Sequence, residues 1–189
     1  MNEQQIIRTS KLLSRVLRHD PSAIGITLDS QGWVEIDQLL TQLARKRRPL
    51  DREHLNQLVE TNNKKRFIFS EDSKRLRANQ GHSIKIDLGL APTPPPETLS
   101  HGTATRFLDS IRDKGLIPGS RQHVHLSDNL QTAIQVGSRH GKPIILTVSS
   151  ALMHQNKHHF YHSENDVWLT DSVPVEFIQF PSSSLNEAT

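Results

Sequence analysis

The stretch Ala91-Pro92-Thr93-Pro94-Pro95-Pro96-Glu97 has four prolines in five residues and divides the sequence into two halves. Proline fixes φ and lacks a backbone N–H, so this stretch excludes a helix and favours an extended, semi-rigid spacer. We therefore expect two domains, residues 1–90 and 99–180, joined by a linker over residues 91–98. Residues 181–189 are polar, and we expect them to form a disordered tail.

The half before the prolines shows helical spacing in three places. Apolar residues recur at helical intervals over 12–17, and proline disfavours a helical residue before it, so this helix is expected to end at Asp20-Pro21. A second helix is predicted through Leu39–Leu43. A third is predicted over residues 55–59, with Asp51 as its N-cap.

A hairpin is expected to follow these three helices. Residues 67–69 and 75–78 read as strands, and the turn-forming residues 70–73 lie between them. Three helices followed by a hairpin indicate a winged-helix-like lobe.

The half after the prolines mixes helices and strands. A helix beginning near Phe107 is expected to stop at Gly115, a typical C-cap residue. The remaining apolar runs predict a helix over 130–138 and strands over 123–126, 144–148, 167–169 and 173–178. Together the two halves predict an α+β protein.

The composition limits the function classes. Lys and Arg number 23 against 20 Asp and Glu, and basic residues crowd into 45–48 and 64–77, which is typical of a nucleic-acid contact or of a solvated basic face. There is no cysteine, which excludes disulfides and cysteine nucleophiles. The first residues do not resemble a signal peptide, and no apolar run approaches the ~20 residues that span a bilayer. We expect a cytoplasmic protein with no membrane contact.

Two polar segments stand out in the second half, His101-Gly102-Thr103 and residues 121–127. On a strand, Arg121, His123 and His125 would share one face, and a turn is expected nearby at Gly102. Guanidinium and imidazole groups on one face attract phosphate. This pattern predicts a site for a phosphorylated ligand.

Seven motifs, taken in order, resemble the KptA-type RNA 2'-phosphotransferases, which remove a 2'-phosphate from RNA with NAD. The motifs are Leu17-Arg18-His19-Asp20-Pro21, Gly32-Trp33-Val34, Lys65-Arg66-Phe67, Arg77-Ala78-Asn79-Gln80-Gly81-His82-Ser83, His101-Gly102-Thr103, Arg121 to Ser127, and Asp166-Val167-Trp168-Leu169-Thr170-Asp171. The resemblance spans nearly the whole chain. It implies an N-terminal winged-helix-like lobe and a C-terminal lobe with the ADP-ribosyltransferase fold.

The resemblance assigns the catalytic positions to Arg18, His19, Arg66 and Arg121. It implies that the RNA 2'-phosphate attacks the ribose carbon bearing nicotinamide in NAD, which gives an ADP-ribosylated phosphate. The ribose 2''-hydroxyl then attacks phosphorus, releasing 2'-OH RNA and ADP-ribose 1'',2''-cyclic phosphate. Arginine suits the phosphate and its developing charge but stays protonated, so among the four only His19 could move a proton.

The resemblance also assigns the NAD contacts, with NAD consumed as a co-substrate. His101, Gly102 and Thr103 would form the turn that holds NAD, and His125, Ser127 and Val167 would line the nicotinamide riboside side. Protein-modifying ADP-ribosyltransferases commonly have a glutamate where this chain has Val167, so the apolar residue argues against that acceptor chemistry. Strand core is the alternative explanation for it.

The expected partner is an RNA bearing a 2'-phosphate, tRNA-like in kind, bound by a monomer. No metal is expected, because His123, His125 and the pair His158-His159 lack cysteine and carboxylate partners. One alternative is ADP-ribosyl transfer to a nucleic-acid terminal phosphate or another acceptor. The other is a winged-helix binding module fused to a ligand-sensing lobe, without enzyme activity.

Overall fold

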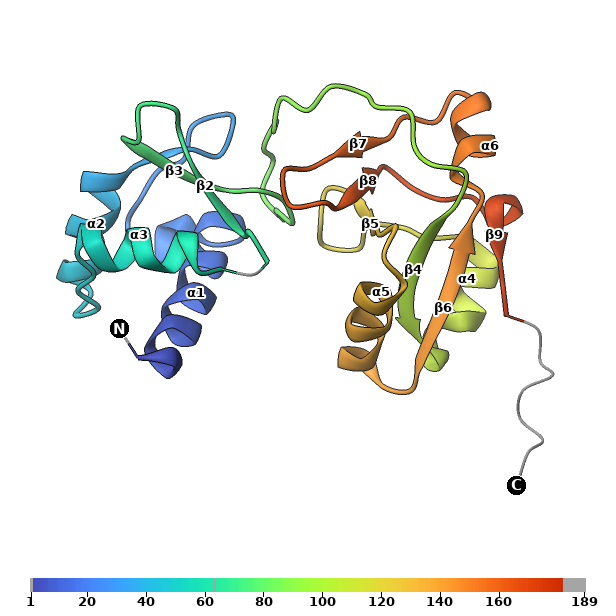
Figure 1. Ribbon diagram of the computed structural model, residues 1–189, viewed down its shortest axis with the longest axis horizontal. Helices are drawn as coiled ribbons and strands as arrows, with labels where there is room; N and C mark the ends of the chain where they lie inside the picture. The colour runs from blue at the N-terminus through green and yellow to red at the C-terminus, as the bar shows by residue number, and fades with distance from the viewer. Residues whose placement is uncertain (1, 63, 182–189) are drawn as a thin grey trace. The chain divides into compact units, whose positions relative to one another are not determined.

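The computed structural model describes residues 2–62 and 64–181 of the 189-residue chain. The chain forms two units, each with its own hydrophobic core (Figure 1). The first contains residues 1–90 and also Ser120–Gln122, and the second contains 91–119 and 123 onwards. The predicted tail begins at Pro181, so all but its first residue lies outside the described residues.

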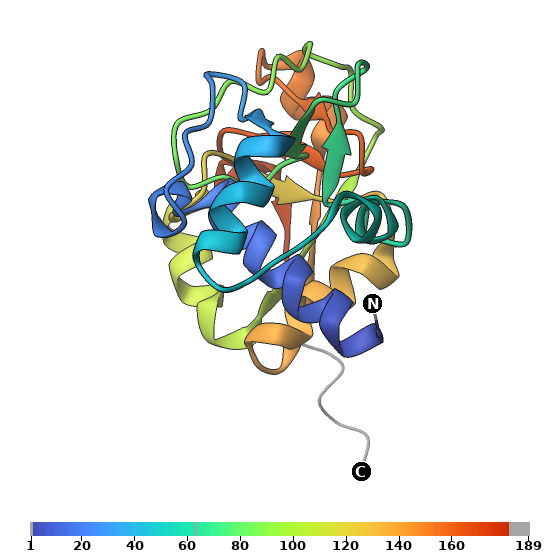
Figure 2. The same ribbon diagram turned by 90° about the vertical axis from the view of Figure 1, so that its left-hand side faces the viewer.

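Three helices build most of the first unit, and all three sequence predictions for them are confirmed (Figure 2). Each buries an apolar face in the same core. Leu17, Leu39 and Leu58, one from each helix, lie in this core with no exposed surface. At the start of the third helix, the Asp51 side chain accepts a hydrogen bond from the His54 N–H, as its N-cap position predicts. The helices are α1 (Glu3–Arg18), α2 (Ile36–Arg45) and α3 (Arg52–Glu60).

The predicted hairpin is confirmed as strands β2 (Phe67–Phe69) and β3 (Arg75–Ala78), which pair in antiparallel register. A third strand that the sequence did not reveal, β1 (Val34–Glu35), pairs with the other edge of β3. Side chains alternate along β3, so Leu76 and Ala78 enter the core while Arg75 and Arg77 face away from it.

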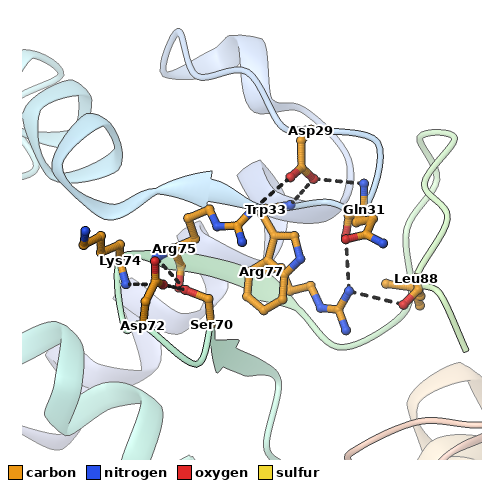
Figure 3. A network of polar contacts seen from close by, with 9 residues as sticks. All are labelled: Asp29, Gln31, Trp33, Ser70, Asp72, Lys74, Arg75, Arg77 and Leu88. Atoms are coloured by element: carbon orange, nitrogen blue, oxygen red, sulfur yellow. Dashed lines mark hydrogen bonds and ion pairs between the residues drawn. The ribbon is translucent and has the colours of Figure 1, made fainter.

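A polar network ties this outer face of the sheet to the loop before β1 (Figure 3). The Asp29 carboxylate accepts the backbone N–H of Trp33 at 2.9 Å and lies 3.5 Å from the Arg75 guanidinium. The Arg77 guanidinium lies 4.4 Å from the centre of the Trp33 ring and donates to the Leu88 carbonyl at 3.2 Å. Two strand arginines therefore hold the segments on either side of the hairpin in place.

The second unit is built on two small antiparallel sheets, with strand orders β4-β6-β9 and β5-β8-β7. Its strands are β4 (Leu99–Ala104), β5 (Val124–Leu126), β6 (Pro143–Val148), β7 (Tyr161–His162), β8 (Trp168–Thr170) and β9 (Ile178–Gln179). Its helices are α4 (Leu108–Lys114), α5 (Leu130–Gly137) and α6 (Ser150–Gln155). Helices and antiparallel sheets in both units confirm the α+β class.

One strand predicted in this unit is wrong. Residues 173–178 do not form one strand, because Pro174 is followed by a 3-10 turn at Val175–Phe177 and only Ile178–Gln179 pairs with β6. In the polar stretch 154–162, His158 and His159 lie in a loop, whereas His154 lies on α6 and His162 on β7. Buried Met153 and Phe160 anchor that stretch to the core, which a reading of its polar residues misses.

The proline-rich stretch is hydrogen-bonded along the second unit. Thr93 N–H donates to the Phe160 carbonyl at 2.8 Å, and the buried Ser150 hydroxyl donates to the Pro96 carbonyl at 2.7 Å. Prolines still offer carbonyl oxygens, so this extended segment is held by the Pro96 acceptor as well as by the Thr93 N–H.

Candidate functional site

The C-terminal end of α1 positions the first two candidate residues, Arg18 and His19. The helix is amphipathic, with Leu13, Val16 and Leu17 fully buried, and it ends where Asp20-Pro21 starts a short 3-10 turn. His19 is the C-cap residue, and its N–H still donates to the Arg15 carbonyl. Cationic side chains at a helix C-terminus complement the helix dipole, so the fold favours this placement before any ligand is considered.

The Arg18 side chain lies against the loop that follows β3. A Cβ at Gly81 would lie 3.6 Å from Arg18 Nη1, so the guanidinium packs directly over this glycine. Gly81 has a φ of +90°, a conformation that side-chain-bearing residues rarely adopt. The Ser83 N–H donates to the Arg18 carbonyl at 3.0 Å, and the Ser83 hydroxyl lies 2.9 Å from His19 Nδ1. The loop therefore fixes both residues.

Arg66 lies immediately before β2 and meets Arg18 through its backbone. Its carbonyl accepts from Arg18 Nη2 at 3.5 Å and from the Asn79 N–H at 2.9 Å. Its Nη1 donates to the Asn62 side chain at 3.4 Å. The residue is half-buried, whereas a strand-end arginine is exposed by default. This burial distinguishes Arg66 from the solvated basic residues around it.

Arg121 reaches the first unit through the segment Ser120–Gln122. The Gln122 N–H donates to the His82 carbonyl at 3.1 Å, and its side-chain amide exchanges two hydrogen bonds with the backbone of Ile86. The chain bends over 121–123, and β5 begins only at Val124. The prediction that Arg121, His123 and His125 share one face of a strand is therefore wrong. Only His125 lies on β5, and Gln122 is hydrogen-bonded to Ile86 instead of to a neighbouring strand.

These cations act on one another. The pKa of Arg18 is lowered to about 10, first by burial and then by the positive charges of Arg66 and Arg121. The pKa of His19 is lowered by burial, then by Arg18 and Arg121. Arg18 Nε is also buried without a hydrogen-bond partner among the described residues. We refer to Arg18, His19, Arg66 and Arg121 as the cationic cluster; a bound anion would lessen the repulsion among these charges.

Sequence reasoning did not include His82 among the site residues, although it noted the polar segment that contains it. His82 is 2% exposed, and its Nε2 has no hydrogen-bond partner among the described residues. Burial and then the charge of Arg18 lower its pKa to about 4, so this ring is neutral at pH 7. The signal in the sequence was the concentration of amide, glycine, imidazole and hydroxyl groups over residues 79–83.

The second candidate group lies in the second unit, where the expected turn at His101-Gly102-Thr103 is wrong. These residues lie inside strand β4 and pair with β6. A Cβ at Gly102 would lie 1.7 Å from the Ala133 carbonyl oxygen, so the glycine is needed because α5 crosses β4 at close range. A tight turn and a close crossing both require glycine, and the sequence alone does not separate them.

The structure brings the other predicted NAD residues to the same corner of this unit. His101 Nδ1 lies 3.1 Å from the His125 carbonyl oxygen, and Ser127 joins β4 through an antiparallel bridge with Ser100. Continuing the β5–β8 register by one residue sets Ser127 opposite Val167. Val167 is half-buried and lies just before β8, where its N–H donates to the Ser163 hydroxyl.

The described residues, 2–62 and 64–181, offer no support for two other classes of site. Within them, no three His, Asp or Glu side chains gather in a way that could hold a metal ion. No helix in those ranges combines the length and apolar character needed to cross a membrane.

The fold and the cationic cluster define an α+β protein whose first unit gathers four cationic side chains, a grouping that suits an anion such as phosphate. The family described as RNA 2'-phosphotransferase, Tpt1 / KptA family, matches residues 4–172, and the chain belongs to this family. A protein of Pseudomonas aeruginosa named "Probable RNA 2'-phosphotransferase" is 53% identical over 180 residues, covering 95% of this chain and 99% of its own. Proteins with the same name from Rhodopirellula baltica and Nostoc punctiforme are 51% and 48% identical, each over 95% of this chain and 98% and 99% of their own.

Proposed function

We propose that this protein removes an internal 2'-phosphate from RNA in an NAD-dependent transfer, acting on tRNA-like molecules. The observation that carries the proposal is the cationic cluster, in which three arginines and a histidine from three separate segments converge within the first unit. Their mutual repulsion is relieved by a phosphate dianion, and arginine presents a planar fork of donors that matches its oxygens. Family membership supplies the position of that phosphate on RNA.

In the proposed first step, the cluster binds the RNA 2'-phosphate and orients one of its oxygens as the nucleophile. NAD is consumed as a substrate and supplies a ribose carbon whose bond to nicotinamide breaks as the new bond to phosphate oxygen forms. The attacking oxygen is already anionic, so no general base is required. This agrees with a cluster made mainly of arginine, which stays protonated at working pH.

In the proposed second step, the neighbouring ribose 2''-hydroxyl attacks phosphorus and the RNA 2'-oxygen leaves. The products are 2'-OH RNA and ADP-ribose 1'',2''-cyclic phosphate, and the proton of the attacking hydroxyl is transferred in net terms to the departing RNA oxygen. Arg18, Arg66 and Arg121 stabilise charge on the transferring phosphoryl group. His19 keeps an exposed surface although partial burial lowers its pKa, and it is the one cluster residue able to carry the proton.

The second unit is proposed as the NAD-binding, ADP-ribosyltransferase-like lobe, and the first as a winged-helix-like lobe. The ring of half-buried His101 lies against the backbone carbonyl of half-buried His125, and Ser127 follows two residues later; imidazole and hydroxyl groups hydrogen-bond ribose hydroxyls and phosphates. Three helices, a paired hairpin and the added strand β1 support the winged-helix-like assignment.

The test is to incubate the protein with NAD and a short RNA carrying one internal, labelled 2'-phosphate, without metal. The label is expected to move to ADP-ribose cyclic phosphate, and Arg66→Ala is expected to abolish the transfer. Arg45→Ala is the matched control, since it removes an exposed arginine of the same unit outside the cluster.

Two other results would redirect the proposal. An RNA that keeps a stable ADP-ribosyl group would indicate transfer to a phosphate acceptor without the second step. NAD left intact, with the RNA still bound, would indicate a binding module and would reject the enzymatic proposal.

A further inference from the structure

A groove that the proposed reaction does not use runs beside α1 in the first unit. It encloses about 220 Å³. Its apolar floor is the half-buried Leu12, which lies over the buried side chains of Val16 and Ile24, and Arg15, Lys46 and Arg48 are the cations that line it. The volume is below the range of pockets for drug-sized ligands, so it suits a single planar ring better than a whole dinucleotide.

The groove is in line with the cationic cluster along the helix. Leu12, Arg15, Val16 and His19 follow a spacing of three, one and three residues, which sets them on one face of α1. Arg15 and His19 are four residues apart, which is about 6 Å of helical rise. Successive phosphates of a stacked strand advance by about 3.4 Å along the axis, so this separation corresponds to roughly two nucleotides.

The charge of the lining favours a polyanion. Arg15 pairs with Asp20 at 3.0 Å, which fixes the guanidinium at the groove without neutralising the other two cations. Lys46 and Arg48 are exposed and follow the C-terminus of α2. Apolar floor and cationic edge together match an unpaired nucleotide, whose base is flat and apolar on its faces and whose backbone is anionic.

We propose that this groove binds an unpaired nucleotide of the RNA strand about two nucleotides away from the 2'-phosphate. Its base lies over Leu12, beneath which Val16 and Ile24 are buried, and flanking backbone phosphates contact Lys46 and Arg48. This inference rests on the proposed function, because the cluster must hold the 2'-phosphate for the strand to continue along α1.

The experiment compares two double variants of the same basic run. Lys46→Ala/Arg48→Ala removes two lining cations, and Arg45→Ala/Arg47→Ala removes two exposed cations of the run outside the groove. Both lower the net charge equally, so general attraction falls by the same amount in each. Binding of a labelled single-stranded RNA with one internal 2'-phosphate is measured without NAD, beside a dinucleotide that carries the same phosphate.

The groove variant is expected to bind the longer RNA about tenfold more weakly and the dinucleotide unchanged, while the control variant changes both less than about threefold. For the groove variant, the slope of log Kd against log salt should fall by about 1.4, because two phosphate contacts are lost and each contributes about 0.7 in a single strand. The proposal would be overturned if the groove and control variants lost affinity for the longer RNA equally. It would also be overturned if the groove variant lost as much affinity for the dinucleotide as for the longer RNA.

A duplex RNA with the same 2'-phosphate tests the unpaired base. Duplex binding is expected to be insensitive to the groove substitutions, and an equal weakening of duplex and single strand would overturn that part. Binding is read without turnover. RNA that binds through the groove but keeps its phosphate in the presence of NAD would therefore reject the proposed function and leave the groove supported.

Discussion

Arg18 links helix, loop and hairpin at the centre of the cationic cluster. Its Nη2 reaches the Arg66 carbonyl, its Nη1 lies over Gly81, and its Nε has no partner among the described residues. Lysine keeps the charge but loses the planar fork of donors. Arg18→Lys is therefore expected to lower kcat/KM for phosphate transfer by about 10²–10³, the cost of one preorganised donor to developing charge. Steady-state kinetics with a 2'-phosphorylated RNA would measure the loss.

The matched control for this substitution is Arg8→Lys, an exposed arginine on the same helix, which should leave the kinetics unchanged. If Arg18→Lys retained full activity, charge alone would suffice at this position and the geometric role of the guanidinium would be refuted.

His82 makes stability depend on pH. Its pKa is about 4 in the folded protein and near 6.5 when unfolded, so the unfolded state binds the extra proton first as pH falls. The contribution of neutral His82 to the free energy of unfolding is fully present above pH 6.5, declines between pH 6.5 and pH 4, and is lost below pH 4. The difference corresponds to roughly 3 kcal/mol. Urea denaturation at pH 7 and pH 4.5 would measure it.

His82→Gln removes the titrating ring and is expected to flatten that pH dependence, whatever it does to stability at pH 7. His54→Gln serves as the control, because His54 is a partly exposed residue paired with Asp51. A pH profile of His82→Gln with the wild-type slope would contradict the assignment.

At the scale of elements, Gly102 sets how closely α5 packs on β4. An added Cβ would meet the Ala133 carbonyl at 1.7 Å, and two backbones cannot adjust as a flexible side chain can. Gly102→Ala is expected to cost at least about 3 kcal/mol in the free energy of unfolding. Gly119→Ala, where the added Cβ meets nothing within 4 Å but φ is +63°, should cost only about 1 kcal/mol. Chemical denaturation of both variants would compare them.

The same elements show what local sequence can predict. The helix α1 and the β2–β3 hairpin follow from periodicity, a proline stop and turn residues, which act within a few positions. Gly102 in a strand and Gln122 held by Ile86 depend on contacts 31 and 36 residues away in sequence, and no local pattern carries that information. Arg66 and Arg121 could be named by resemblance, but their convergence on Arg18 required the fold.

At the scale of the whole molecule, the two units have separate cores, and each contains one of the two tryptophans. Trp33 lies beside Arg77 in the first unit, and Trp168 stacks on His162 in the second, with ring centres 4.5 Å apart. Variants that keep one tryptophan each, Trp168→Phe and Trp33→Phe, therefore report the unfolding of each unit on its own.

With these reporters, Gly102→Ala should shift the Trp168 transition to lower urea by about 1–3 M, the expected cost divided by a typical m-value. The Trp33 transition should move far less, because Trp33 and Gly102 lie in different units with separate cores. Leu58→Ala, which opens a cavity in the first core, should shift Trp33 and leave Trp168 nearly unchanged. Transitions that move together in both variants would show one cooperative unit, and the energetic separation of the two cores would be rejected.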